Sequence, residues 1–168
     1  MRLVTSTALL LACAVSLGAC SKSGDTQTST SAANVEASAQ AAPAPSAADQ
    51  QKLLASLPAP YNAADLTNGE SKFAICRSCH TITADGPNMT GPNLHGLFGR
   101  KAGTHPDFNY SEGLKNSGIT WDAATLDKWI AGPRDVVPDT KMSFAGLQDP
   151  KDRADLIGYL KVNAGDAS

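Results

Sequence analysis

Residues 61 to 163 carry too few branched and aromatic side chains to form a hydrophobic core without help. Leu, Ile, Val and Phe together supply 20 of these 103 residues, which is thin for a domain of this size. Residues 81 to 120 are rich in Gly, Pro and Asn and contain few strand signals. A long irregular stretch inside a compact domain is expected where the loop serves a function, such as wrapping another group. The domain is therefore predicted to fold around a large apolar cofactor.

Three segments of this region have the signals of helices. Residues 63–79 repeat apolar and small side chains at intervals of three and four, residues 122–131 end at a Gly-Pro pair, and residues 150–163 begin with Asp-Pro. The rest of the region lacks strand periodicity, so the predicted fold class is all-α.

The pentapeptide Cys76-Arg77-Ser78-Cys79-His80 fits the attachment pattern of c-type haem. In that pattern two cysteines form thioethers with the haem vinyl groups, and the histidine ligates the iron. A Cys-x-x-Cys turn suits two thioethers on one edge of a porphyrin, and the next residue lies close beneath the iron. Cys76 and Cys79 are therefore the predicted attachment sites of one covalent haem c, with His80 as the predicted metal ligand.

Three other interpretations of the two cysteines compete with haem attachment. A zinc site needs two further ligands, and Cys20, His95 and His105 lack paired spacing. A thioredoxin-type dithiol needs a βαβ context that this domain lacks. A structural disulfide is the ordinary expectation in an exported protein, but it leaves His80, the thin core and the long loop unexplained.

A haem iron held by His80 has either a sixth ligand or an open site, and two methionines are available. Met89 lies nine residues after His80 in a Gly/Pro turn region, which is a poor position from which to reach the opposite haem face. Met142 follows a helix and a Pro-bounded loop, from which the chain can return to that face. On the residues alone, core filling is the commoner role of such a methionine.

The N-terminus has the features of an export signal. Residues 1–19 have a charged start, an apolar middle and a small-residue end, and they resemble a bacterial lipoprotein signal that makes Cys20 the predicted lipidation site. An uncleaved transmembrane anchor is the alternative, although the 16 residues from 4 to 19 contain four hydroxyl side chains and barely span a bilayer. Both interpretations predict a periplasmic domain tethered to a membrane, with inner or outer membrane left open.

Residues 20–60 are predicted to be a flexible linker, and residues 61–168 the haem domain. Ala, Ser, Thr, Pro and Gln make up 29 of the 40 residues from 21 to 60, and none is aromatic, so this segment cannot build a core. Within it, residues 46–57 are capable of forming a helix with Ser46 as its N-cap.

The sequence from about Asn68 to Lys161 resembles class I cytochromes c of the mitochondrial and bacterial type. The match extends well beyond the haem pentapeptide and includes these residues: Gly69, Phe73, the run Gly91-Pro92-Asn93-Leu94-His95-Gly96-Leu97-Phe98-Gly99-Arg100, Tyr110, Gly118-Ile119-Thr120-Trp121, Leu126, Pro133, Thr140-Lys141-Met142-Ser143-Phe144-Ala145-Gly146, Asp155-Leu156-Ile157 and Tyr159-Leu160. The resemblance implies a small cytochrome c fold, with about three main helices plus short ones and loops wrapped around one covalently bound haem.

The resemblance also implies roles for individual residues. Met142 is the implied distal ligand of the iron, and the Pro92 carbonyl is implied to orient His80. Four side chains are implied to lie beside the haem propionates: Arg100, Tyr110, Trp121 and Thr140. Such side chains suit propionates because their N–H and O–H groups donate hydrogen bonds.

Four further positions bear on the packing and on departures from the family pattern. Gly69 and Tyr159 are implied to lie where the first and last helices cross. Trp129 stands where the family usually has a tyrosine near the methionine sulfur, and Leu114 replaces an asparagine often found on the distal side. These two departures suggest a drier pocket.

The combined features predict an electron-transfer protein rather than an enzyme. A net charge of −2 excludes a strongly basic nucleic-acid binder. The expected role is one-electron transfer by a monomer, from a quinol-oxidising cytochrome bc complex to a terminal oxidase, while tethered through its lipidated N-terminus. Alternatives are a donor to a peroxidase or a nitrogen-oxide reductase, and a haem-based ligand sensor or weak peroxidase in which Met142 leaves the iron.

Overall fold

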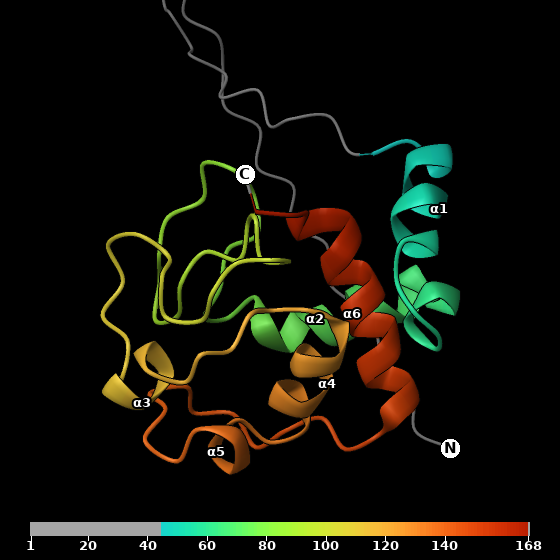
Figure 1. Cartoon of the computed structure of the whole chain (residues 1–168). Coiled ribbons are helices and arrows are strands. Elements are labelled where there is room, and N and C mark those ends of the chain that lie inside the picture. The colour runs from blue at the N-terminus through green and yellow to red at the C-terminus, as the bar shows by residue number, and fades with distance from the viewer. Residues whose placement is uncertain (1–44, 168) are drawn as a thin grey trace, which may run out of the picture. The chain divides into compact units, whose positions relative to one another are not determined.

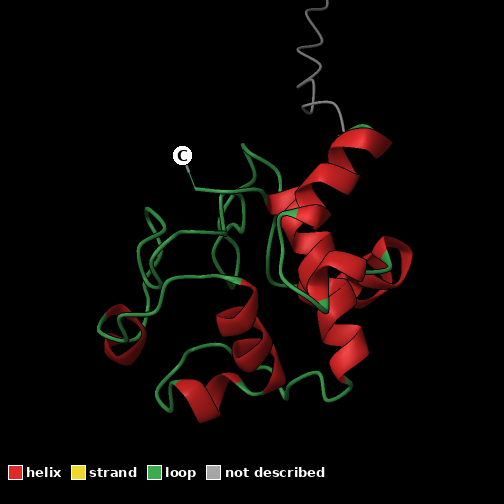
Figure 2. Cartoon of the chain, turned by 45° about the vertical axis from the view of Figure 1, so that its right-hand side comes forward, coloured by secondary structure: helices red, strands yellow, loops and turns green. Residues whose placement is uncertain are grey.

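A computed structural model of the protein describes residues 45–167, and every regular element in that range is helical. The elements are α1 (Ala47–Ala55), the 3-10 helix η1 (Tyr61–Ala63), α2 (Leu66–Cys76), α3 (Glu112–Lys115), α4 (Ala123–Ala131), α5 (Pro133–Val136) and α6 (Pro150–Ala164). Within residues 45–167 the only strand-like pairings are two isolated bridges, Phe98 with Asp166 and Lys101 with Thr120. The predicted all-α fold class is confirmed (Figure 2).

The three predicted helices are present, and their starts are set by aspartate caps. α2 is shorter than the predicted 63–79. It starts after Asp65, whose carboxylate accepts hydrogen bonds from the Thr67 and Asn68 N–H groups, and it ends at Cys76. Asp122 and Thr125 form a capping box that starts α4, and Asp149 caps α6 ahead of a proline in its first turn. The end of α2 at Cys76 leaves Cys79 and His80 in the turn that follows.

α2 and α6 cross at Gly69, as the resemblance implies. A Cβ atom on Gly69 would lie 2.3 Å from the Asp155 carbonyl oxygen and 2.7 Å from the Tyr159 Cβ, so only glycine permits this approach. The Asp155 carboxylate joins the same crossing, accepting hydrogen bonds from the Asp65 backbone N–H at 2.9 Å and the Asn68 amide at 2.7 Å. The crossing is thus fixed by both close packing and buried hydrogen bonds.

Residues 47–57 belong to the folded part, which corrects the predicted linker end at residue 60. Ser46 caps α1 as expected, and Leu57, only 8% exposed, is part of the hydrophobic core. α6 carries Gly158 opposite this segment, where a Cβ would lie 2.3 Å from the Ala64 Cβ and 3.0 Å from Leu54 Cδ2. Composition predicts a linker here, whereas these apolar contacts fold the segment onto α6.

The predicted signal peptide, Cys20 and the predicted linker up to residue 44 lie outside the described residues. In residues 45–167 no helix combines the length and the hydropathy needed to cross a bilayer.

α6 divides the described part of the molecule into two sides. Figure 1 shows α1 on one side of α6 and the long irregular segments between α2 and α4 on the other. The core residues with the least exposure, Phe73 and Leu156 at 1% and Ile157 and Ala164 at 0%, lie on α2 and α6. The irregular side is where the predicted site residues gather.

Candidate functional site

A cavity of about 280 Å³ lies on the irregular side of α6 and is lined mainly by apolar side chains. Its walls come from the end of α2, the loops between α2 and α4, α4 itself, the segment after α5, and one face of α6. The lining includes every predicted site residue within the described chain: Cys76, Cys79, His80, Pro92, Arg100, Tyr110, Trp121, Thr140 and Met142. Residues separated by more than 60 positions in sequence therefore meet at one site.

The turn after α2 brings the two cysteines and the histidine close together. The backbone N–H groups of Cys79 and His80 both donate to the Cys76 carbonyl at 3.0 Å. Both thiols are free, and burial raises the pKa of the Cys76 thiol to about 11. Cys76 is therefore a neutral thiol at neutral pH, unlike the low-pKa thiolate of a redox dithiol.

Two of the competing interpretations lack their structural context in the described chain. Residues 45–167 contain no group of three or more Cys, His, Asp or Glu side chains that could hold a metal ion. The same range contains no strand with which to build a βαβ unit. Residues 45–167 by themselves thus offer neither the ligand cluster of a zinc site nor the strands of a thioredoxin-type centre.

His80 is held with one ring nitrogen occupied and the other free. Its Nδ1–H donates to the Pro92 carbonyl at 2.7 Å, and Nε2 has no hydrogen-bond partner in residues 45–167. Burial lowers the pKa of His80, and the Pro92 hydrogen bond opposes this only in part. The side chain is therefore a neutral imidazole with the Nε2 lone pair available, which is the form that ligates a metal.

The backbone at Gly91 lies in close contact with the His80 ring. A Cβ on Gly91 would lie 2.3 Å from His80 Cε1 and 2.7 Å from both ring nitrogens. The Gly91 N–H also donates to the Cys79 carbonyl at 2.8 Å. The backbone at Gly91 thus lies against the imidazole and leaves no room for any other residue.

One wall of the cavity is polar and carries an uncompensated cation. The Arg100 guanidinium donates to the carbonyls of His95 at 2.7 Å and Asn93 at 3.3 Å, and no carboxylate in residues 45–167 forms an ion pair with it. Burial lowers the pKa of Arg100 and raises that of Tyr110, while each group offsets part of the other's shift. A half-buried guanidinium without a carboxylate suits an anionic group of a cofactor.

Met142 lies on a wall of hydrocarbon and aromatic rings. Leu114 and Trp129 line the cavity with it, and the indoles of Trp121 and Trp129 meet edge to face with 5.4 Å between ring centroids. The Met142 N–H donates to Thr140 Oγ1 at 3.2 Å. The sulfur receives no hydrogen bond from any residue between 45 and 167, which fits the drier pocket predicted from Leu114 and Trp129.

Met89 lies apart from this cavity. Its side chain is 47% exposed, and Met142 is the only methionine among the described residues that line the cavity. The geometry therefore favours Met142 over Met89 as a ligand from the chain.

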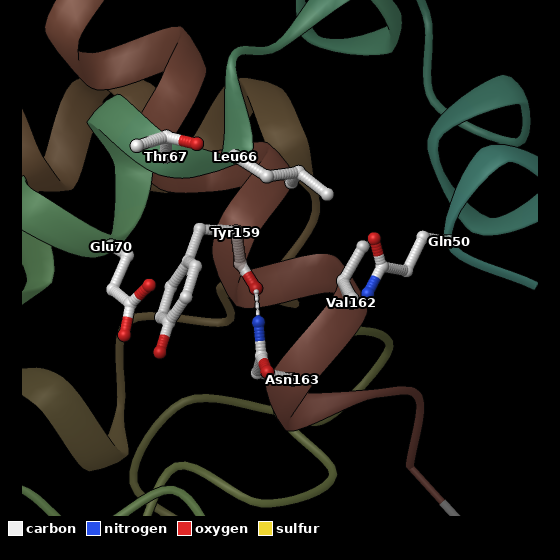
Figure 3. Close-up of a pocket in the computed structure, with 7 residues that line it drawn as sticks. All are labelled: Gln50, Leu66, Thr67, Glu70, Tyr159, Val162 and Asn163. Atoms are coloured by element: carbon white, nitrogen blue, oxygen red, sulfur yellow. Dashed lines mark hydrogen bonds between the residues drawn. The ribbon is translucent and has the colours of Figure 1, made fainter. Parts of the chain in front are cut away.

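A second pocket of about 210 Å³ lies at the junction of α1, α2 and α6. Figure 3 shows its seven lining residues, Gln50, Leu66, Thr67, Glu70, Tyr159, Val162 and Asn163, with the Asn163 amide hydrogen-bonded to the Tyr159 carbonyl at 2.9 Å. It shares no lining residue with the larger cavity. Its side chains form no cluster suited to catalysis or metal binding.

Asn93 organises the loop around His80, a role that the sequence alone does not reveal. It is 2% exposed, and its amide donates to the carbonyls of Thr83 at 2.8 Å and Gly86 at 2.6 Å. Its N–H donates to the Asn88 side chain at 2.8 Å. The repeated Gly-Pro-Asn triplets are the signal that could have pointed to these two asparagines.

Taken together, the residues present fit a haem c. The cavity offers two thiols at one edge, a neutral imidazole, a thioether, an unpaired guanidinium and apolar walls. These are the donor types that c-type haem attachment and axial ligation use.

Comparisons with known proteins agree with this chemistry, although no family model matches the chain. The chain is 48% identical to cytochrome c2 of Rhodomicrobium vannielii over 105 residues, covering 62% of this chain and 84% of that protein. It is 44% identical to cytochrome c2 of Blastochloris viridis over 116 residues, covering 69% and 91%. Among solved structures, cytochrome cH from Methylobacterium extorquens matches with a TM-score of 0.55 and 45% identity, covering 58% of this chain and 98% of that one. The chain therefore belongs to the class I c-type cytochromes, which are electron carriers with one covalent haem c and not enzymes.

Proposed function

We propose that the chain is a membrane-tethered periplasmic electron carrier whose haem occupies the larger cavity. Cys76 and Cys79 would form the thioethers with the haem, and His80 and Met142 would ligate its iron. Arg100, Tyr110, Trp121 and Thr140 surround the haem propionates. The observation that carries this proposal is that one cavity gathers the two free thiols, the imidazole of His80 and the Met142 side chain.

The chain's own residues account for what such a carrier needs. When bound, the haem supplies a one-electron couple at its iron. The Pro92 carbonyl fixes the His80 ring through Nδ1 and leaves Nε2 free to bind. Arg100 compensates negative charge on the polar wall, and the apolar wall around Met142 excludes water. Two side-chain ligands leave no open position for a substrate.

The proposed partners are a quinol-oxidising cytochrome bc complex as donor and a terminal oxidase as acceptor. A peroxidase or a nitrogen-oxide reductase is an alternative acceptor. The net charge of −2 favours association that does not depend on strong long-range attraction. A tether substitutes for such attraction because it raises the effective concentration near a partner in the same membrane to the millimolar range.

The carrier role is tested with membranes that contain the bc complex and the oxidase. The oxidised protein should be reduced when a quinol is added and reoxidised through the oxidase, and Met142→Ala should slow the cycle. Exposed Asp85 provides a control, since Asp85→Asn should cycle like the wild type. A wild-type protein that neither complex reduces or oxidises contradicts the proposed partners.

The tether is tested on the full chain by membrane fractionation. If Cys20 is lipidated after removal of residues 1–19, the membrane-bound wild-type protein should begin at Cys20 and carry the mass of its acyl chains. A membrane-bound wild-type protein that keeps residues 1–19 without acyl chains supports a transmembrane anchor. A wild-type protein found free of membranes contradicts both forms of tether.

A further inference from the structure

The segment that carries Met142 is held in place almost entirely by side chains. It runs from Val137, after α5, to Leu147, before α6. Within the described chain, residues 141–146 make no backbone–backbone hydrogen bond, and the segment is fastened at its far end by the Leu147 N–H bond to the Ile130 carbonyl at 2.9 Å. Such a segment needs other contacts to keep one conformation.

Two side chains of this segment fasten it to the stretch around α3. The Asp139 carboxylate accepts hydrogen bonds from the Gly113 N–H at 2.9 Å and from the Ser111 hydroxyl at 3.4 Å. On the other side of Thr140, the Lys141 ammonium donates to the Asn109 carbonyl at 2.9 Å. Figure 1 shows the chain after α5 turning back beside α3.

Only glycine at position 113 leaves room for the Asp139 carboxylate. A Cβ on Gly113 would lie 2.0 Å from one Asp139 carboxylate oxygen, so the carboxylate sits where any other side chain would be. The Gly113 N–H belongs to the first turn of α3, where backbone donors lack partners within the helix. Ser111 satisfies the next donor, that of Leu114, at 3.3 Å. Asp139 thus completes the start of α3 from 26 residues away.

The two fastened stretches form neighbouring parts of the cavity wall. Tyr110 and Leu114 line the cavity from the α3 stretch, and Thr140 and Met142 line it from the other. We propose that Asp139 is a positioning residue for Met142, because its hydrogen bond to the Gly113 N–H ties these walls together and keeps Met142 against the haem iron. The inference rests on the proposed ligation by Met142 and adds the residue that maintains it.

The test compares Asp139→Ala with Asp139→Asn in the haem-loaded full chain. Alanine removes the acceptor, whereas the asparagine carbonyl can still accept from Gly113. Asp85→Ala is the matched control, since Asp85 is an exposed carboxylate for which no side-chain contact is found in residues 45–167. Two quantities are measured: hydrogen exchange of the Gly113 amide, and the affinity of the oxidised iron for added imidazole, which competes with Met142.

Loss of the Asp139 acceptor should raise the Gly113 exchange rate and the imidazole affinity by about 3- to 10-fold in Asp139→Ala. Asp139→Asn should recover most of the wild-type behaviour, and Asp85→Ala should match the wild type. Faster Gly113 exchange with unchanged imidazole affinity would overturn the positioning role, as would no change in either quantity. If Asp139→Asn shows the same increase in Gly113 exchange and imidazole affinity as Asp139→Ala, the hydrogen bond to Gly113 is not the cause of the effect.

Failure of the ligation itself has a separate signature. If Met142→Ala and the wild type bind imidazole equally, Met142 is not a ligand, and both the ligation and its positioning by Asp139 are wrong. If Met142→Ala binds imidazole more tightly but Asp139→Ala does not, only the role of Asp139 is overturned.

Discussion

Where α2 crosses α6 the chain packs backbone against backbone, whereas the segments between α2 and α4 enclose a cavity. At the crossing, Gly69 and Asp155 approach too closely for any added atom. The irregular half instead relies on side chains that bind distant backbone groups, such as Asn93 at the Thr83 and Gly86 carbonyls. The difference is that one half packs on itself, whereas the other encloses the cavity in which we propose the haem to bind.

Removing the attachment cysteines should have the largest effect of the changes considered, and it should fall mainly on the irregular half. We expect Cys76→Ser with Cys79→Ser to lose covalent haem, and an unfilled cavity of 280 Å³ corresponds to about 7 kcal/mol of lost stability. Since that is comparable with the whole stability of a domain, the loops from 81 to 121 should lose amide protection while α2 and α6 retain more. Hydrogen exchange measures this, with Asp85→Ala at an exposed position outside the cavity as the control. Uniform loss of protection would contradict the two-half account.

Gly69→Ala should damage the helical half without touching the haem. The new Cβ would meet the Asp155 carbonyl at 2.3 Å, and forcing the helices apart should lower the free energy of unfolding by about 3 kcal/mol. Denaturant unfolding gives this value, and the exposed Ser71→Ala on the same helix controls for helix propensity. The haem absorption spectrum should stay that of the wild type, and a changed spectrum would count against independent halves.

Gly91→Ala is the matching change in the irregular half. Its Cβ would lie 2.3 Å from His80 Cε1, so the imidazole must move away from Pro92. We expect a smaller loss of stability, about 2 kcal/mol, because a loop relaxes more easily than a helix crossing. Here the haem spectrum should change, in contrast to Gly69→Ala. An unaltered spectrum and reduction potential would show that the close contact with the Gly91 backbone does not position His80.

Asp155→Asn should have the smallest effect on the free energy of unfolding, and this effect should depend on pH. Burial alone would raise the pKa of Asp155, but hydrogen bonds from Lys151, Asn68 and the Asp65 backbone outweigh it and lower that pKa below the ordinary 3.8. The carboxylate therefore stabilises the fold above pH 3.8, and this contribution is lost as pH falls through the lowered pKa. At neutral pH the substitution should cost about 1 kcal/mol, because the asparagine carbonyl can still accept part of these hydrogen bonds.

The pH dependence is measured by denaturant unfolding of both proteins between neutral pH and strongly acidic pH. The gap between wild type and Asp155→Asn should close in acid. A gap that stays constant over this range would mean that the charge of Asp155 contributes nothing to the crossing.

The sequence predicts the helices well because their signals are local. Asp122 and Asp149 mark the starts of α4 and α6, and the apolar spacing of α2 is visible without the structure. The predicted end of the linker is wrong because composition alone does not reveal that Leu57 packs into the core. Nor does composition reveal that Gly158, about a hundred positions away, lets α6 approach this segment, where a Cβ would lie 3.0 Å from Leu54 Cδ2.

The candidate site is likewise predictable only where its sequence signals are local or shared with a family. The pentapeptide predicts Cys76, Cys79 and His80, and the family resemblance extends the prediction to Pro92, Arg100, Tyr110, Trp121, Thr140 and Met142. The contacts that hold the loops escape such analysis, since Asn93 and Asp139 bind backbone groups that are recognisable only once the chain is folded. Side chain to backbone hydrogen bonds of long range carry little sequence signal.

The central claim, that His80 and Met142 both ligate the haem, is tested most directly with carbon monoxide. The visible spectrum of the reduced protein is recorded with and without the gas near neutral pH, beside Met142→Ala. The account predicts that the wild type resists carbon monoxide whereas Met142→Ala binds it readily. If the wild type binds it as readily as Met142→Ala does, the iron has an open position, and Met142 is not its sixth ligand.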